Sequence, residues 1–170
     1  MTVPVRAGVI TASTKGARGE RADESGPAMR EVLEANGIEV AFTDLVIDDV
    51  DAIASAIEAA IAAGANVVLT SGGTGLSPND VTPEATRKVI EREVPGIAES
   101  IRARSLAKTP HGMISRGIAG SVGPCLVVNL PGSPHAVRES LEVVLPILAH
   151  AVELLAGESG EGGHGRGRSA

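Results

Sequence analysis

The feature that most restricts the fold is a short, nearly all-apolar segment that runs directly into a glycine cluster. Residues 66–71 (NVVLTS) are apolar almost throughout, and Gly72, Gly73, Thr74 and Gly75 follow without a gap. A strand without alternation of polar and apolar residues is typical of a parallel sheet that is covered on both faces. Parallel strands need crossover connections, which are usually helices, so this segment predicts an α/β fold.

Strand-like and helix-like segments alternate along the rest of the chain. Further strands are predicted over residues 5–11, 38–46 and 125–130. Helices are predicted over residues 25–36, 53–63, 82–94 and 133–156, with Ser25 as the cap of the first and Pro146 as a possible kink in the last. Residues 96–120 are predicted to be helical or irregular. This order predicts a doubly wound α/β sandwich with a mostly parallel central sheet.

The chain is expected to form one domain over residues 1–156. Residues 157–170 (GESGEGGHGRGRSA) are rich in glycine and polar residues. A segment with so few apolar side chains gains too little from burial to offset the entropy of ordering it. We therefore predict a disordered tail from residue 157 onwards.

Composition excludes nucleic acid as an expected partner. The formal net charge is −6, and Phe42 is the single aromatic residue in the chain. Binding to a nucleic-acid backbone needs clustered Lys and Arg, and single-strand binding adds aromatic stacking. Any phosphorylated ligand must instead be held locally, by backbone N–H groups, a few Arg side chains or a metal held by carboxylates.

The compartment is predicted to be the cytoplasm. Cys125 is the only cysteine, so an internal disulfide is excluded, and its apolar surroundings predict an inert core thiol. No stretch approaches the roughly 20 apolar residues of a membrane span, and no signal-peptide pattern is present at the N-terminus. A membrane partner is therefore not expected.

The glycine cluster has two interpretations at this point. Glycines after a strand allow backbone N–H groups to approach a phosphate closely, because no Cβ obstructs the approach. The same residues are equally compatible with a tight turn between strand and helix. A P-loop is disfavoured, since no Lys-Ser or Lys-Thr follows at the required spacing.

Polar residues follow several strands and should meet at one edge of the sheet. The carboxyl ends of parallel strands share an edge, which would bring together residues 11–13, Asp48, 71–75 and 129–133. Helices that begin nearby would add N-termini, each with roughly half a positive charge. Asp80 lies just before one such helix; it is a candidate catalytic carboxylate, with local capping as the alternative. Such an edge could hold a polyphosphate without a basic surface.

Several motifs together resemble one known family. They are LTSGGTG at 69–75, DVTPEAT at 80–86, IEREVPG at 90–96, TPHGMISR at 109–116 and NLPGSP at 129–134. They resemble the molybdopterin adenylyltransferases, which include the bacterial Mog and MoaB-like proteins and the G domain of gephyrin. The resemblance extends over residues 5–155.

The resemblance implies a cytoplasmic homotrimer that uses Mg²⁺ and ATP to adenylylate molybdopterin, with release of pyrophosphate. Asp80 and Asp48 match the acidic catalytic positions and would hold the metal. The nucleotide and its phosphates would lie against Ser13, Ser71, Gly72, Gly73, Thr74 and Gly75. Molybdopterin would lie against Asp23, Ser25, Gly26, Ser115, Asn129, Pro131, Gly132 and Ser133.

Two other functions stay open on the sequence. Asn79 stands where the resembled family commonly has Arg. This change would permit a non-catalytic protein of the same fold that binds molybdopterin or serves as a scaffold. A related domain acting on another phosphorylated small molecule is the second alternative, because the chemistry of a site decides function and the fold does not.

Overall fold

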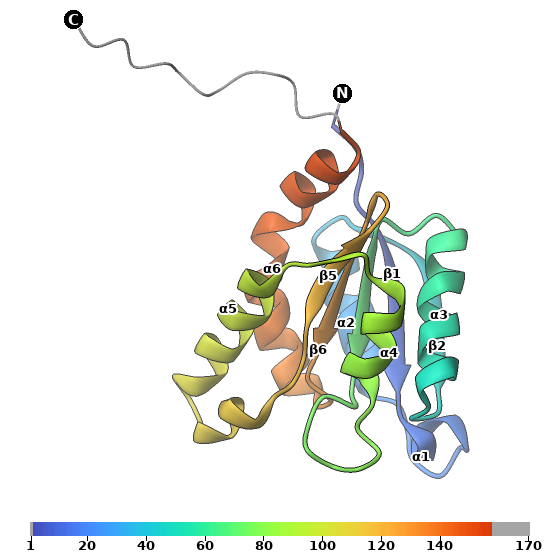
Figure 1. Ribbon diagram of the computed structural model, residues 1–170, viewed down its shortest axis with the longest axis vertical. Helices are drawn as coiled ribbons and strands as arrows, with labels where there is room; N and C mark the ends of the chain where they lie inside the picture. The colour runs from blue at the N-terminus through green and yellow to red at the C-terminus, as the bar shows by residue number, and fades with distance from the viewer. Residues whose placement is uncertain (1, 158–170) are drawn as a thin grey trace, which may run out of the picture.

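Four contiguous strands run parallel in a six-stranded sheet, as expected from the apolar segments. The computed structural model describes residues 2–157 (Figure 1). The parallel strands are β1 (Arg6–Ala12), β2 (Glu39–Val46), β3 (Val67–Ser71) and β6 (Cys125–Leu130), and the strand order is β2-β1-β3-β6-β5-β4. The predicted α/β architecture with a mostly parallel sheet is confirmed. The predicted tail lies outside the described residues from residue 158 onwards.

The other two strands form an antiparallel edge that was not predicted. Strand β5 (Ala119–Val122) pairs antiparallel with β6, and β4 (Arg92–Glu93) pairs antiparallel with β5. Gly123, at φ +49°, makes the turn between β5 and β6. Strands this short have almost no periodicity to detect, and the pairing partners of β4 lie far along the chain.

Helices cover both faces of the sheet. Helices α2 (Ser25–Ala35), α5 (Pro95–Leu106) and α6 (Pro134–Leu155) pack on one face, and α3 (Val50–Ala62) and α4 (Thr82–Val89) pack on the other (Figure 1). Helix α6 is assigned as one continuous helix that includes Pro146. Two short elements complete the order, α1 (Thr14–Ala17) and the 3₁₀ helix η1 (Pro110–Ile114). Within the described residues, no helix is long and apolar enough to cross a membrane.

Two apolar cores hold these layers together. On one face, Met29, Leu33 and Leu141 are fully buried against strand residues such as Leu69. On the other face, Ile53 and Ile57 of α3 pack against the remaining side chains of the same strands. The all-buried strand β3 explains the absence of alternation, because both of its faces are covered.

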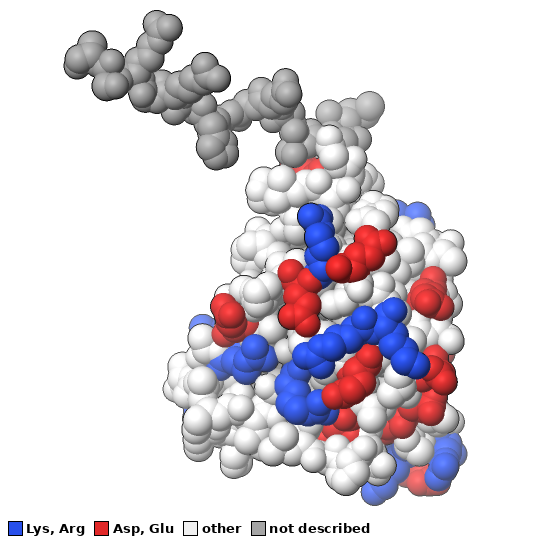
Figure 2. All heavy atoms as spheres, viewed as in Figure 1, with Lys and Arg blue, Asp and Glu red and all other residues white. Residues whose placement is uncertain are grey.

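Charged side chains are mixed on the surface. On the face shown in Figure 2, several basic side chains lie next to one another in a curved band, and acidic side chains lie beside it. Ion pairs between elements include Lys88–Asp51 and Arg138–Glu31.

The Cys125 thiol should be unreactive in the folded protein. The residue is fully buried, and burial raises the pKa of the thiol to about 12. Since the thiolate is the reactive species, we expect negligible labelling by a disulfide reagent at pH 8 and full labelling after unfolding in guanidinium chloride. Stoichiometric labelling of the native protein, measured by absorbance and mass spectrometry, would contradict this expectation.

Candidate active site

A polar cavity of about 360 Å³ lies beyond the carboxyl ends of the parallel strands. It gathers loops that follow β1, β2, β3 and β6, as the convergence argument predicted. The predicted site residues that line it are Ser13, Asp23, Ser25, Asp48, Ser71, Gly72, Gly73, Asp80, Gly132 and Ser133. Helix α2 begins at the cavity wall, and Ser133 caps α6 there by accepting a hydrogen bond from the backbone N of Ala136.

The other predicted residues lie outside the lining of this cavity. They are Gly26, Thr74, Gly75, Ser115, Asn129 and Pro131. Asn129 is buried within the sheet, and its amide nitrogen donates to Thr70 Oγ1 at 2.9 Å and to Thr86 Oγ1 at 2.8 Å. Its carbonyl oxygen accepts from the Ile118 backbone N at 3.2 Å. Asn129 therefore joins β6 to β3, α4 and the segment before β5, and its amide is fully occupied within the protein.

Asp48 is held by the start of α1. Its Oδ2 accepts hydrogen bonds from the backbone N and the Oγ1 of Thr14, both at 2.8 Å. Its own backbone N donates to Thr14 Oγ1 at 2.9 Å. Oδ1 of Asp48 makes no hydrogen bond within residues 2–157, so one oxygen fixes the side chain and the other is available at the cavity.

In Asp80, as in Asp48, one carboxylate oxygen accepts a hydrogen bond within the described residues and the other accepts none. Its Oδ2 accepts from the Ser77 backbone N at 3.0 Å, and its backbone N donates to Ser77 O at 2.9 Å. A Cβ on Gly75 would come within 2.8 Å of Oδ2, so this glycine leaves room for the carboxylate. In the described part of the chain, Oδ1 has no hydrogen-bond partner. The Asp80 side chain therefore caps the local backbone through Oδ2 and leaves Oδ1 available to a ligand.

The two glycines after β3 are required by the fold as well as by any ligand. Gly72 and Gly73 have φ values of +88° and +65°, which side-chain-bearing residues rarely adopt. A Cβ on Gly72 would collide with the carbonyl oxygen of Ala12, and one on Gly73 would collide with Thr82 Oγ1. The turn and phosphate-loop interpretations are therefore compatible, and a substitution at Gly73 would not separate them.

Ser71 lies at the cavity wall with an unpaired hydroxyl. The residue is fully buried, and its Oγ has no hydrogen-bond partner among the described residues, as is also the case for Thr82 Oγ1. A buried polar group without a partner costs about 1–3 kcal/mol, so such groups are rare in folded proteins. The Ser71 hydroxyl is shielded from solvent, so a ligand in the cavity would reach it only if the wall moved.

Asp23 and Ser25 tie the first loop to the last one. Asp23 Oδ1 accepts from the backbone N atoms of Ser25 and Gly26 at 3.1 and 3.0 Å, and its Oδ2 accepts from Thr11 Oγ1 at 3.0 Å. The prediction that Ser25 caps the helix is wrong, because the Asp23 carboxylate takes that role. Ser25 Oγ instead donates to the carbonyl oxygen of Gly132 at 2.6 Å.

Two charged residues of the cavity were missed by the sequence analysis. Arg21 and Glu24 line it together with Asp23, Asp48 and Asp80. Arg21 is thus the single guanidinium in a lining that contains four carboxylates. Nothing in the local sequence distinguishes it from the other charged residues of the loop over residues 13–24, because only the folding of that loop over the sheet edge brings it here.

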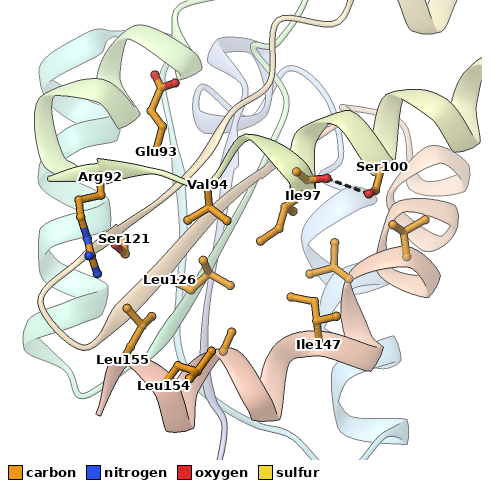
Figure 3. A pocket seen from close by; sticks show the side chains of 14 residues that line it. Arg92, Glu93, Val94, Ile97, Ser100, Ser121, Leu126, Ile147, Leu154 and Leu155 are labelled. Carbon is orange, nitrogen blue, oxygen red and sulfur yellow. Dashed lines mark hydrogen bonds between the residues drawn. The ribbon is translucent and has the colours of Figure 1, made fainter. Parts of the chain in front are cut away.

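A second cavity has a different chemical character. It measures about 670 Å³ and lies between α5, α6 and the β4 edge, and Ile97, Ile147 and Leu154 lie around it (Figure 3). One guanidinium, from Arg92, and one carboxylate, from Glu93, are the charged groups of its lining. It lacks the paired carboxylates and glycine loops of the smaller cavity, which is therefore the better candidate for phosphate chemistry.

The fold and the polar cavity define a class of α/β proteins that bind phosphorylated small molecules at the carboxyl ends of parallel strands. The chain belongs to the family described as "Probable molybdopterin binding domain", whose profile matches residues 8–150. The family resemblance expected from the motifs is therefore confirmed.

Similar proteins from several organisms support this membership. The molybdopterin adenylyltransferase of Helicobacter pylori is 38% identical over 157 residues, covering 90% of this chain and 89% of its own. That of Pyrococcus furiosus is 39% identical over 155 residues, covering 86% and 90%. The crystal structure of the molybdopterin biosynthesis enzyme MoaB from Thermus thermophilus superposes with a TM-score of 0.84 at 51% identity, covering 90% and 97%.

Proposed function

We propose that this chain is a molybdopterin adenylyltransferase of molybdenum cofactor biosynthesis. A terminal phosphate oxygen of molybdopterin attacks the α-phosphorus of ATP, and the bond from that phosphorus to the oxygen bridging to the β-phosphate breaks. Adenylylated molybdopterin and pyrophosphate are the products. Relatives of this name, at 38–39% identity over most of both chains, support the reaction. The ATP requirement agrees with a cytoplasmic location.

One observation carries the proposal. Asp48 and Asp80 line the same cavity, and each uses Oδ2 to fix itself while Oδ1 is available. Both carboxylates share this cavity with Gly72 and Gly73, whose positive φ values and lack of a Cβ allow a phosphate to approach the backbone closely. Nucleotidyl transfer needs charge neutralisation and alignment of two anions more than a side-chain nucleophile, which this cavity is suited to provide.

The donor set fits Mg²⁺. Within the described residues, no cluster of three or more His, Cys, Asp or Glu forms a closed metal site. Mg²⁺ commonly binds one or two carboxylates and completes its shell with water and substrate phosphates. Asp48 and Asp80 would hold it, and when bound it would neutralise phosphate charge.

The remaining residues divide between the two substrates. The backbone N–H group of Gly73 and the turn at Gly72 would bind the nucleotide phosphates, with Ser71 and Ser13 at the same wall, and Arg21 would offset their charge. The Gly72 N–H itself donates to Leu130 O at 3.3 Å and holds the turn against β6. Ser25, Gly132 and Ser133 would bind molybdopterin, with Asp23 ordering that wall through its backbone contacts. Asn129 would act indirectly, by holding the strand that leads into Pro131 and Gly132.

The decisive experiment is pyrophosphate release by the purified protein given MgATP and molybdopterin together. We expect release only when both substrates and Mg²⁺ are present, with adenylylated molybdopterin identified by mass spectrometry. Binding of molybdopterin without pyrophosphate release would support the non-catalytic alternative and contradict the proposal. Release with a different phosphorylated acceptor, and none with molybdopterin, would support the second alternative.

The protein is expected to be a homotrimer, a proposal that rests on the family resemblance. A trimer of 17.1 kDa chains should give three times the monomer mass in light scattering at micromolar concentration. The exposed side chains of Ile147 and Leu154, beside the apolar cavity, would favour association over a monomer. A measured mass near that of one chain would contradict this prediction.

A further inference from the structure

The segment that carries Asp80 has no regular structure of its own. Residues 72–81 connect β3 to α4 without a helix or strand, and residues 76–79 are exposed. Inside the segment, the turn from Ser77 to Asp80 and the bond from the Thr82 backbone N to Gly73 O, at 3.0 Å, provide the ordering contacts. So small a set of contacts would leave the Asp80 carboxylate poorly placed unless something outside the segment held it.

Arg116 provides that support from a distant part of the chain. Its backbone N donates to Thr74 O at 2.7 Å, and its Nε donates to Gly75 O at 2.8 Å. One terminal nitrogen, Nη2, donates to the carbonyl oxygen of Asp80 itself at 2.6 Å. The other, Nη1, pairs with Glu84 in the first turn of α4. One residue therefore contacts the segment at Thr74 and Gly75 and again at Asp80, on both sides of the exposed residues 76–79.

The two residues that follow Arg116 are themselves held in place by hydrogen bonds. The next residue, Gly117, offers its carbonyl oxygen to Arg102 Nη1 of α5 at 2.8 Å. The backbone N of Ile118 donates to the buried Asn129 side chain. The hydrogen bond from Arg116 also lowers the pKa of the Glu84 carboxyl, so this carboxylate remains charged near neutral pH.

A guanidinium is suited to this geometry, and an ammonium is not. Arg presents five N–H donors in a planar fork, so it can bond two backbone carbonyl groups and a carboxylate in fixed directions. Lys has a single nitrogen on a flexible chain and could satisfy one of these partners well. The three side-chain acceptors of Arg116, on Gly75, Asp80 and Glu84, match the Arg fork.

We infer that Arg116 is a positioning residue that clamps the 72–81 segment and thereby places the free carboxylate oxygen of Asp80 at the cavity. Arg116 lies outside the cavity lining, so it acts through Asp80 and not on the substrates. The inference rests on the proposed function for its catalytic consequence. The other half of the inference, that Arg116 orders the 72–81 segment, rests on the hydrogen bonds alone.

The test compares Arg116→Met and Arg116→Lys with Arg104→Met as a matched control. Arg104 of α5 pairs with Glu142 of α6, and within residues 2–157 it makes no hydrogen bond to the 72–81 segment or to residues 115–118. Amide hydrogen exchange of peptides covering residues 74–82 is measured without substrates. We expect exchange to quicken about tenfold in Arg116→Met, somewhat less in Arg116→Lys, and to stay at the parental rate in Arg104→Met.

Kinetics supply the second readout. In Arg116→Met we expect kcat for pyrophosphate release to fall roughly 10- to 100-fold, since a small misplacement of a catalytic group is sufficient for such a loss. The half-saturating Mg²⁺ concentration should rise. The KM for molybdopterin should stay within about twofold of the parental value. Arg116→Lys should be intermediate and keeps the charge if Arg116→Met folds poorly. Arg104→Met should retain the parental Mg²⁺ dependence.

The two proposals can fail separately. Parental exchange over residues 74–82 in both Arg116 variants would overturn the inference, and so would an unchanged Mg²⁺ dependence with a turnover no lower than that of Arg104→Met. A parent protein that releases no pyrophosphate would contradict the proposed function, while the exchange measurement would still decide whether Arg116 orders the segment.

Discussion

Replacing Asp80 with Asn is expected to slow adenylyl transfer by roughly two to four powers of ten, which corresponds to about 3–5 kcal/mol of lost transition-state stabilisation. The amide has almost the same shape, and its oxygen can still accept the hydrogen bond from the Ser77 backbone N. The loop should therefore persist, with a stability change of at most about 1 kcal/mol. The negative charge at the cavity is what the substitution removes. Pyrophosphate release and melting temperature are to be measured on the same sample.

Asp49→Asn is the matched control for this prediction. Asp49 caps α3, where its Oδ1 accepts from the backbone N atoms of Asp51 and Ala52 at 3.0 and 2.9 Å, and it lies outside the cavity lining. The control should lose little stability and no turnover. If Asp80→Asn behaves like Asp49→Asn, with turnover within a few-fold of the parent, Asp80 is only a cap and the metal must be held elsewhere.

Asn129→Leu is expected to lower the free energy of unfolding by about 2–5 kcal/mol, since each buried polar group left without a partner costs about 1–3 kcal/mol. The leucine side chain has a similar size but offers no hydrogen bond. It would leave the Ile118 backbone N and the Thr70 hydroxyl without their present partner, in surroundings where Thr70 is fully buried. The melting temperature should fall by roughly 10 °C for a domain of this size.

The measurement must suit this chain. It contains no Trp and no Tyr, so unfolding in urea is best followed by far-ultraviolet circular dichroism at one fixed protein concentration, because association would shift the apparent stability. Thr70→Val is the matched comparison: it removes one hydroxyl and leaves the Asn129 bonds to Thr86 and Ile118 in place. A loss below about 1 kcal/mol in Asn129→Leu would show that the network contributes little.

Asn129 shows why a sequence motif does not by itself identify the residues that contact a ligand. The family motif that includes Asn129 suggested contact with molybdopterin. The structure places its amide between β6, β3 and α4, with every group used internally. A residue can be part of a functional motif because it builds the wall of a site, and sequence spacing does not distinguish that role from contact with a ligand.

The sequence by itself determined the parallel strands, the helices between them and the edge of the sheet at which the site would lie. These follow from local patterns: unbroken apolar runs in doubly covered strands, glycines where φ is positive, and the shared edge of parallel carboxyl ends. Asp48, Ser71 and Asp80 could be placed at that edge because each follows a predicted strand or precedes a predicted helix.

Only the tertiary structure decided which polar side chains meet. Arg21 reaches the cavity through the folding of an irregular loop, and Arg116 contacts a segment some 40 residues earlier in the chain. Strands β4 and β5 exist because they pair with one another and with β6. Hydrophobic periodicity reports which face of an element is buried, whereas these contacts depend on directional hydrogen bonds between distant residues, and such bonds leave no periodic signal in the sequence.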